Sequence, residues 1–215
     1  MYQSNIGKKN ADKMKQNQVS ISFVGVFSAP MQIPMLDLNF LNNFFGKAGS
    51  AFATATPMGL IVRDRESPGP AVAITPQKII ISATDLDKLV EYIKRLQSGI
   101  PKCEFAAYGL NQEIEWLELE KPVKEWMVDK FISSDLKDKD GSVTCGKVNL
   151  QYTINKNEQL YLDFEPRMNE DKGMFGAINH HNQYAISGFP NEERLRHLFS
   201  DSKEKVNSYL NALML

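Results

Sequence analysis

Alternation of apolar and polar residues is clearest in the middle of the chain, from Cys103 to Leu119 (C-E-F-A-A-Y-G-L-N-Q-E-I-E-W-L-E-L). Large apolar residues occupy even positions of this stretch: Tyr108, Leu110, Ile114 and Trp116. Because successive side chains of a strand point to opposite faces, this period of two predicts a long strand with one buried face. The apolar positions become odd after Trp116, at Leu117 and Leu119, so we expect a bulge or bend there.

Further strands are predicted on both sides of this stretch. They are expected at 19–27, 58–65, 71–83, 143–154, 159–164 and 174–189. The first of them, V-S-I-S-F-V-G-V-F, is rich in β-branched and aromatic residues, which favour strands. The segment 71–83 contains Pro76-Gln77, and N-K-N-E lies before Gln159. These turn residues predict two tight hairpins.

Apolar residues three and four positions apart predict four helices. They are expected at 36–45, from Thr84 to about Ser98, from Pro122 to about Ser133, and from Pro190 to the end of the chain. The second helix has the clearest pattern, with Asp87 three residues after Thr84 as in a capping box and Gly99 at its end.

This order of elements predicts an α+β fold in which helices pack on one side of one or two antiparallel sheets. Residues 1–18 are polar and are predicted to form a mobile arm, and residues 19–215 a single α+β domain. The halves 19–102 and 103–215 each contain several strands with a hairpin and finish with a helix. A βββα-type pseudo-repeat is therefore one hypothesis, in which the stretch from Cys103 begins the second half and joins two sheets into one.

The composition is that of an ordinary globular protein, with 215 residues, 42% hydrophobic and 24% charged. A net charge of −1 gives no general electrostatic reason to bind nucleic acid or an anionic membrane. No apolar run approaches the roughly 20 residues of a membrane-spanning helix, and the polar start does not suit a secretory signal. Cys103 and Cys145 lie far apart and predict reduced thiols in a cytoplasmic protein, with one disulfide as the alternative.

Two segments share residues with known ligand-binding loops. Residues 46–57 contain the glycines, lysine and hydroxyls of a phosphate loop, but Lys47 precedes Gly49, whereas a Walker lysine follows the last glycine. We expect a flexible loop there, with a lid as the functional alternative. Residues 135–141 (D-L-K-D-K-D-G) match part of an EF-hand, but Leu136 and Lys147 stand at positions that need ligands, so calcium binding is not expected.

The polar arm contains four lysines: Lys8, Lys9, Lys13 and Lys15. Such an arm can contact phosphates, although a solvated tail is the simpler interpretation. Aromatic residues elsewhere are not interleaved with basic residues, as an RNA-binding sheet would require. Nucleic-acid binding is therefore not favoured.

The histidines and paired carboxylates are the candidate chemical groups. His180 and His181 are adjacent, so on a strand they point to opposite faces and could share a metal only if the chain turned there. An exposed polar turn is the simpler interpretation, with a general acid or base as the alternative. Glu113 and Glu115 share a face at about 6–7 Å. That spacing suits acid–base work on a glycoside or a divalent cation, but a solvated sheet face explains it as well.

Signatures for a Ser or Cys nucleophile or for a dinucleotide loop are missing from the sequence. We therefore predict a non-catalytic, soluble module that binds a protein partner or a second copy of itself, using the edges and the uncovered face of an open sheet. The alternative is an enzyme or small-ligand receptor that uses His180, His181, Glu113 and Glu115. No cofactor or metal is expected.

Overall fold

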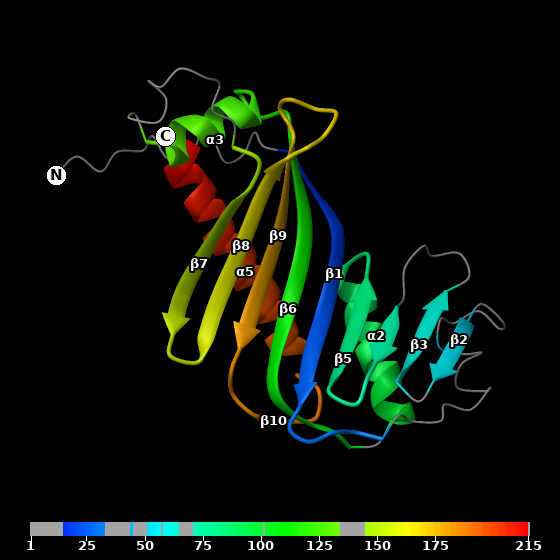
Figure 1. The fold of residues 1–215 in the computed structure, drawn as a ribbon. Coiled ribbons are helices and arrows are strands. Elements are labelled where there is room, and N and C mark those ends of the chain that lie inside the picture. The colour runs from blue at the N-terminus through cyan, green and yellow to red at the C-terminus, as the bar shows by residue number, and fades with distance from the viewer. Residues whose placement is uncertain are drawn as a thin grey trace.

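The computed structural model describes residues 15–32, 44, 51–56, 58–64, 71–100, 102–133 and 145–214. In these residues ten strands form one antiparallel sheet, accompanied by three helices (Figure 1). The strands are β1 (Lys15–Phe27), β2 (Ala51–Thr56), β3 (Gly59–Asp64), β4 (Val72–Ile74), β5 (Lys78–Ala83), β6 (Glu104–Leu117), β7 (Val148–Asn155), β8 (Glu158–Pro166), β9 (Met174–Asn182) and β10 (Ile186–Ser187). The helices are α2 (Leu86–Gly99), α3 (Val123–Phe131) and α5 (Glu192–Met214). The predicted α+β class with an antiparallel sheet is confirmed.

The sheet runs in the order β2-β3-β4-β5-β1-β6-β9-β8-β7, and β10 pairs with one end of β6. Strands β1 and β6 have 13 and 14 residues and lie side by side at the centre (Figure 1). The strand predicted from Cys103 to Leu119 is confirmed as β6. Because β6 pairs with β1 on one side and β9 on the other, it joins the strands of both halves into one sheet.

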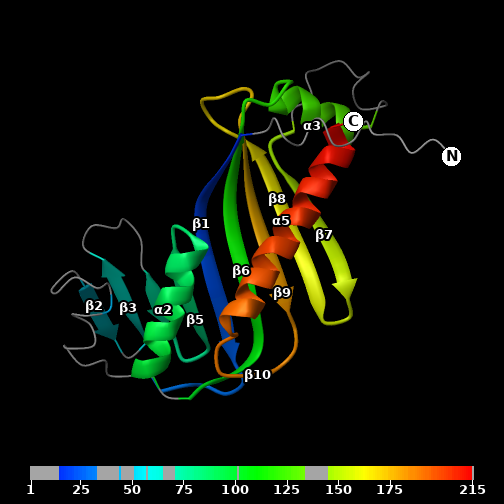
Figure 2. The same ribbon diagram turned by 180° about the vertical axis from the view of Figure 1, so that it is seen from behind.

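Helices α2 and α5 both lie on the same face of the sheet (Figure 2). Helix α2 packs against β5 and β1, and α5 packs against β6 and β9. Helix α3 lies at one end of the sheet, near the C-terminal end of α5. The opposite face carries no helix in the described part of the chain, and we call it the uncovered face.

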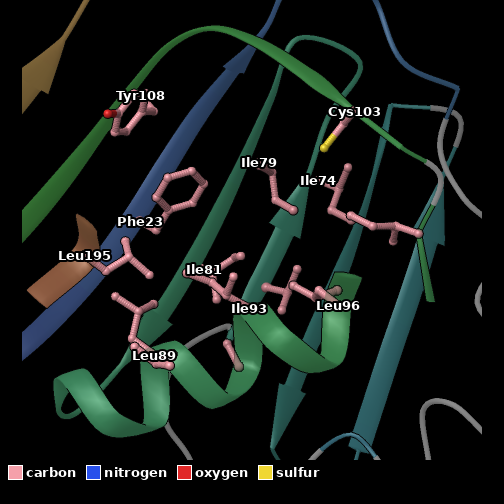
Figure 3. Close-up of a cluster of buried hydrophobic side chains, with 14 of the residues drawn as sticks. Phe23, Ile74, Ile79, Ile81, Leu89, Ile93, Leu96, Cys103, Tyr108 and Leu195 are labelled. Carbon is pink, nitrogen blue, oxygen red and sulfur yellow. The ribbon is translucent and has the colours of Figure 1, made fainter. Parts of the chain in front are cut away.

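Two hydrophobic cores lie between the sheet and the helices. The first core joins β1, β3, β4 and β5 to α2, and it includes Phe23, Ile81 and Leu89 (Figure 3). The second core joins β6, β7, β8 and β9 to α3 and to the C-terminal part of α5, and Trp116 is buried in it. Strand β6 contributes to both cores, with Leu110 in the first.

The structure differs from the predicted strands and helices at three places. Strand β1 begins at Lys15, whereas the predicted strand began at Val19. Residues 15–18, which were predicted to belong to the mobile arm, are therefore paired with β6. Residues 51–56 of the predicted loop 46–57 form β2, paired with β3. The N-cap of α2 is Asp85 and not Thr84, because the Asp85 side chain accepts a hydrogen bond from the Lys88 N–H at 2.9 Å.

Strand β6 also changes face near its N-terminal end, where no irregularity was predicted. Phe105 and Tyr108 are both buried, and the pairing with β1 shifts register between Val26 and Phe27. This irregularity places an extra residue on β6 at Ala106, which moves Phe105 to the helix-covered face. Strand β6 ends at Leu117, and the bend expected after Trp116 is found at Glu118, whose φ is 60°. Leu119 lies beyond this bend and is buried in the same core as Trp116.

Some predictions fall outside the described residues. These are Lys8, Lys9 and Lys13 of the arm, residues 46–50 and 57 of the loop, the turn at 67–70, and the polar loop 135–141. From the predicted helix 36–45 only Phe44 is described, as helical and buried. The βββα pseudo-repeat of the halves 19–102 and 103–215 is not confirmed by the arrangement of the strands.

Candidate functional site

Strand β9 places the two adjacent histidines on opposite faces of the sheet. His180 points toward α5 and is fully buried, with its Nε2 2.7 Å from Glu158 Oε1. Its Nδ1 is 4.0 Å from Asp201 Oδ2 and has no hydrogen-bond partner within the described residues. His181 lies on the uncovered face, and partial burial lowers its pKa below the ordinary value. The two imidazoles therefore do not share a site.

A belt of polar residues crosses the helix-covered face between the two cores. Gln112 Nε2 donates to Ser202 Oγ at 2.6 Å, and Ser202 Oγ donates to the carbonyl oxygen of Leu198 at 2.7 Å. Gln112 stands between Leu110 of the first core and Ile114 of the second. Because buried polar groups bond in only a few geometries, this pair fixes how α5 lies on β6.

Arg194 extends the belt to the N-terminal end of α5. Its guanidinium donates to Tyr184 Oη at 2.7 Å, to Asn182 Oδ1 at 3.0 Å and to Tyr108 Oη at 3.3 Å. Burial, followed by the hydrogen bond with Tyr184, raises the pKa of Tyr108 to about 12. With its donors used in this way, Arg194 acts as a structural clamp between α5 and the strands.

Cross-strand pairing arranges the uncovered face into rows of side chains. Ile79 and Ile81 are buried in the first core, so Ile80 between them points to the uncovered face, together with the residues paired to it. Residues paired directly across an antiparallel ladder share a face. An apolar row therefore crosses four strands of the first half: Ile61, Ala73, Ile80 and Val24.

Two further apolar side chains, Phe52 and Val26, flank this row. Phe52 is 49% exposed and Val26 39%, and Ile61 within the row is 38% exposed. The guanidinium of Arg63 lies over the Phe52 ring, 5.8 Å from its centre. We call these three residues and the apolar row together the apolar patch.

A second row, two residues further along the strands, is polar across six strands. Its members are Ser82, Ser22, Asn111, Asn179, Tyr161 and Gln151. The side chains of Ser22, Asn111 and Asn179 have no hydrogen-bond partner in the part of the chain that the structure describes. We call this set the polar row.

A third row carries the predicted carboxylate Glu113. Glu113 pairs with Ala177 of β9, which pairs with Asp163 of β8. Ser20 Oγ donates to Glu113 Oε2 at 2.6 Å, and Lys147 Nζ lies 3.0 Å from Asp163 Oδ2. The small Ala177 between the two carboxylates leaves a hollow of about 340 Å³, which the polar row borders.

The structure brings only one of the four predicted site residues to this hollow. Glu113 lines it, together with Asn111, Asn179, Tyr161 and Asp163. Glu115 lies one row away and forms an ion pair with Arg167 at 3.1 Å. Alternation within a strand shows which residues face outward, but no pattern in the sequence indicates which strands are neighbours in the sheet. The hollow residues on β8 and β9 were therefore not predicted.

No group of three or more His, Cys, Asp or Glu side chains in the described residues is placed to hold a metal ion. Cys103 and Cys145 are free, buried thiols in different cores. Among the described helices, none combines the length and apolarity needed to cross a membrane. No protein-family model matches the chain, and no curated protein matches its sequence.

Proposed function

We propose that this protein is a non-catalytic module that assembles with a second copy of itself through the apolar patch of its uncovered face. The observation that carries this proposal is the apolar row, which continues across four strands and has no described helix over it. Single exposed apolar residues are common on protein surfaces, but contiguous groups mark interaction sites.

A second copy suits this patch for geometric reasons. A sheet that has one apolar area uncovered buries it most readily against another sheet, at a spacing of about 10 Å. A two-fold axis places identical patches against each other, so apolar side chains meet apolar side chains. The patch extends from Phe52 of β2 to Val24 and Val26 of β1, so it lies on the first half of the sheet.

The acidic groups of the uncovered face support a non-catalytic role. Glu113 accepts a hydrogen bond from Ser20, Glu115 is paired with Arg167, and Asp163 is paired with Lys147. Each of these carboxylates is thus held by a neighbouring side chain, which suits a fixed feature of a binding face.

Light scattering coupled to size exclusion tests the proposal over a concentration series. The double variant Val26→Ser with Ile61→Ser removes two exposed side chains from the patch, and we expect it to shift a dimer to a monomer without changing the far-UV circular dichroism spectrum. The matched control is Met168→Ser, which removes a 99% exposed apolar side chain outside the patch. A wild-type protein that stays monomeric at every concentration would overturn the proposal, as would a double variant that associates as strongly as the wild type.

A further inference from the structure

The hollow on the second half of the uncovered face has the dimensions of a small binding site. Its floor is Ala177, and Glu113 and Asp163 rise on the strands to either side. Neighbouring strands are about 4.8 Å apart, so the two carboxylate-bearing backbones are separated by about 10 Å. The volume of about 340 Å³ is at the lower end of the range of about 300–1,000 Å³ found for ligand pockets.

Uncommitted hydrogen-bonding groups line one side of this hollow. Asn111 and Asn179 are directly paired neighbours on β6 and β9, and Ser22 is the next residue of the polar row. Each amide offers a carbonyl oxygen and two N–H donors, and the serine hydroxyl both donates and accepts. None of these three side chains has a partner among the described residues, so their hydrogen-bonding capacity is open to a ligand.

The charges of the hollow restrict what can bind. Glu113 and Asp163 are the only ionisable acids among its described lining residues, and that lining includes no lysine or arginine. Lys147 compensates the charge of Asp163 at 3.0 Å, whereas the described partner of Glu113 is the neutral hydroxyl of Ser20. The remaining negative charge disfavours phosphates and other anions, including a nucleic-acid backbone. In the described residues, the hollow does not bring together the three or more His, Cys, Asp or Glu side chains that would hold a metal ion.

We propose that this hollow binds a neutral polyhydroxylated ligand, such as one sugar unit of a saccharide. Sugar hydroxyls can donate to the carboxylates of Glu113 and Asp163 and accept from the amides of Asn111 and Asn179. The ring of Tyr161 forms part of the wall and offers an apolar surface for the C–H groups of a sugar. The Tyr161 hydroxyl donates to Gln159, which fixes the ring in place. This proposal does not depend on self-assembly, since the hollow and the apolar patch share no residue.

Titration of ¹⁵N-labelled protein with neutral sugars, followed by NMR, tests this proposal. The probes are glucose, galactose, mannose, N-acetylglucosamine and cellobiose in the millimolar range, with inorganic phosphate and spermidine as charged comparisons. We expect at least one neutral sugar to shift the side-chain amide signals of Asn111 and Asn179 saturably. Lack of binding by all the sugars would overturn the proposal, and so would a response to phosphate or spermidine alone.

Paired variants separate a specific site from weak surface contact. Asn111→Ala with Asn179→Ala should weaken sugar binding about tenfold or more, since each lost hydrogen bond is worth about 1 kcal/mol. Gln151→Ala belongs to the same polar row but lies outside the hollow, and it should bind as the wild type does. Sugar affinity that survives the double substitution would contradict the proposal. The patch variant Val26→Ser with Ile61→Ser should keep its sugar affinity, so a failure of self-assembly is distinguished from a failure of this site.

Discussion

The two halves of the uncovered face differ sharply although they belong to one sheet. On the first half, the row that starts at Ile61 is apolar as far as Val24 of β1. The same row continues through Gly109 of β6 to His181 and Gln159. The change falls between the two central strands. Since strand pairing is alike on both sides, the difference comes from the side chains and not from the backbone.

The helix-covered face shows no such contrast, because both halves bury large apolar side chains there. Folding requires that burial, since it supplies most of the favourable free energy. Folding sets no such demand on the uncovered face, where polar residues suit a solvated strand. The apolar patch is thus a departure from what stability requires, and it is a place to look for function.

The largest effect is expected from overfilling either core at a glycine. A Cβ on Gly25 would lie 2.4 Å from Phe105 in the first core, and one on Gly176 would lie 2.3 Å from Trp116 in the second. Replacing either glycine by alanine should lower the free energy of unfolding by about 3 kcal/mol or more, because both approaches are far shorter than a normal contact. Gly146→Ala is the control, because its Cβ would meet nothing within 4 Å.

These variants also show whether the halves are energetically separate. Denaturant unfolding followed by tryptophan fluorescence reports on the second core, and far-UV circular dichroism reports on the whole sheet. Because β6 contributes to both cores, we expect the two signals to keep a common midpoint in each variant. Midpoints that separate would show that the halves unfold independently.

An intermediate effect is expected at the polar belt between the cores. Ser202→Ala alone leaves Gln112 Nε2 buried without its acceptor and should cost about 1–3 kcal/mol of unfolding free energy. Adding Gln112→Leu removes both partners and the unpaired Gln112 Oε1. The double variant should therefore recover most of the loss in chemical denaturation. A double variant less stable than Ser202→Ala would show that the belt contributes more than this one pair.

A smaller effect on stability is expected when polar residues on the second half of the uncovered face are replaced by apolar residues like those of the first half. Asn111→Val with Asn179→Val places two β-branched residues directly opposite each other on the uncovered face. Such pairs add about 0.2–1 kcal/mol in a sheet, so the melting temperature should rise slightly. Light scattering should show stronger self-association, and sugar binding should be lost. Unchanged association would show that apolar area alone does not drive assembly.

The smallest effect is the acid response of His181. Burial lowers its pKa from the ordinary value of 6.5, so the unfolded chain takes up a proton at a higher pH than the folded protein does. This contribution to stability is present above pH 6.5 and is lost as the pH falls toward the lowered pKa. His181→Gln should therefore lose less stability between about pH 7 and about pH 5 than the wild type. An equal loss in both proteins would assign the acid response to other groups.

Regular alternation made the long strands predictable, and the failures have physical causes. Residues 51–56 (A-F-A-T-A-T) alternate, but Ala53, which packs against the first core, is too small to give a strong apolar signal. Their strand exists because β3 supplies a ladder of backbone hydrogen bonds. Residues 15–18 are polar and likewise gave no apolar signal. They are held in the sheet by pairing with β6 and by a hydrogen bond of 2.8 Å from Gln16 Nε2 to Asn207 Oδ1 of α5.

The candidate site was predictable only within one strand. The spacing of Glu113 and Glu115 placed them on a shared face, and both lie on the uncovered face. The neighbours that make the hollow belong to β8 and β9, and the register of distant strands is not encoded in local periodicity. For the same reason the pairing of His180 with Glu158 could not be foreseen, although they lie on adjacent strands.

The sharing of β6 and α5 between the cores has a consequence during synthesis of the chain. The first core needs Leu110 from β6 and Leu198 from α5, although its other strands and α2 end at Gly99. A ribosome adds roughly 5–20 residues per second, so Leu198 follows Leu110 by on the order of 10 s. Until then the nascent first core lacks its α5 cover. The N-terminal half is therefore expected to need protection from aggregation until the last helix has been made.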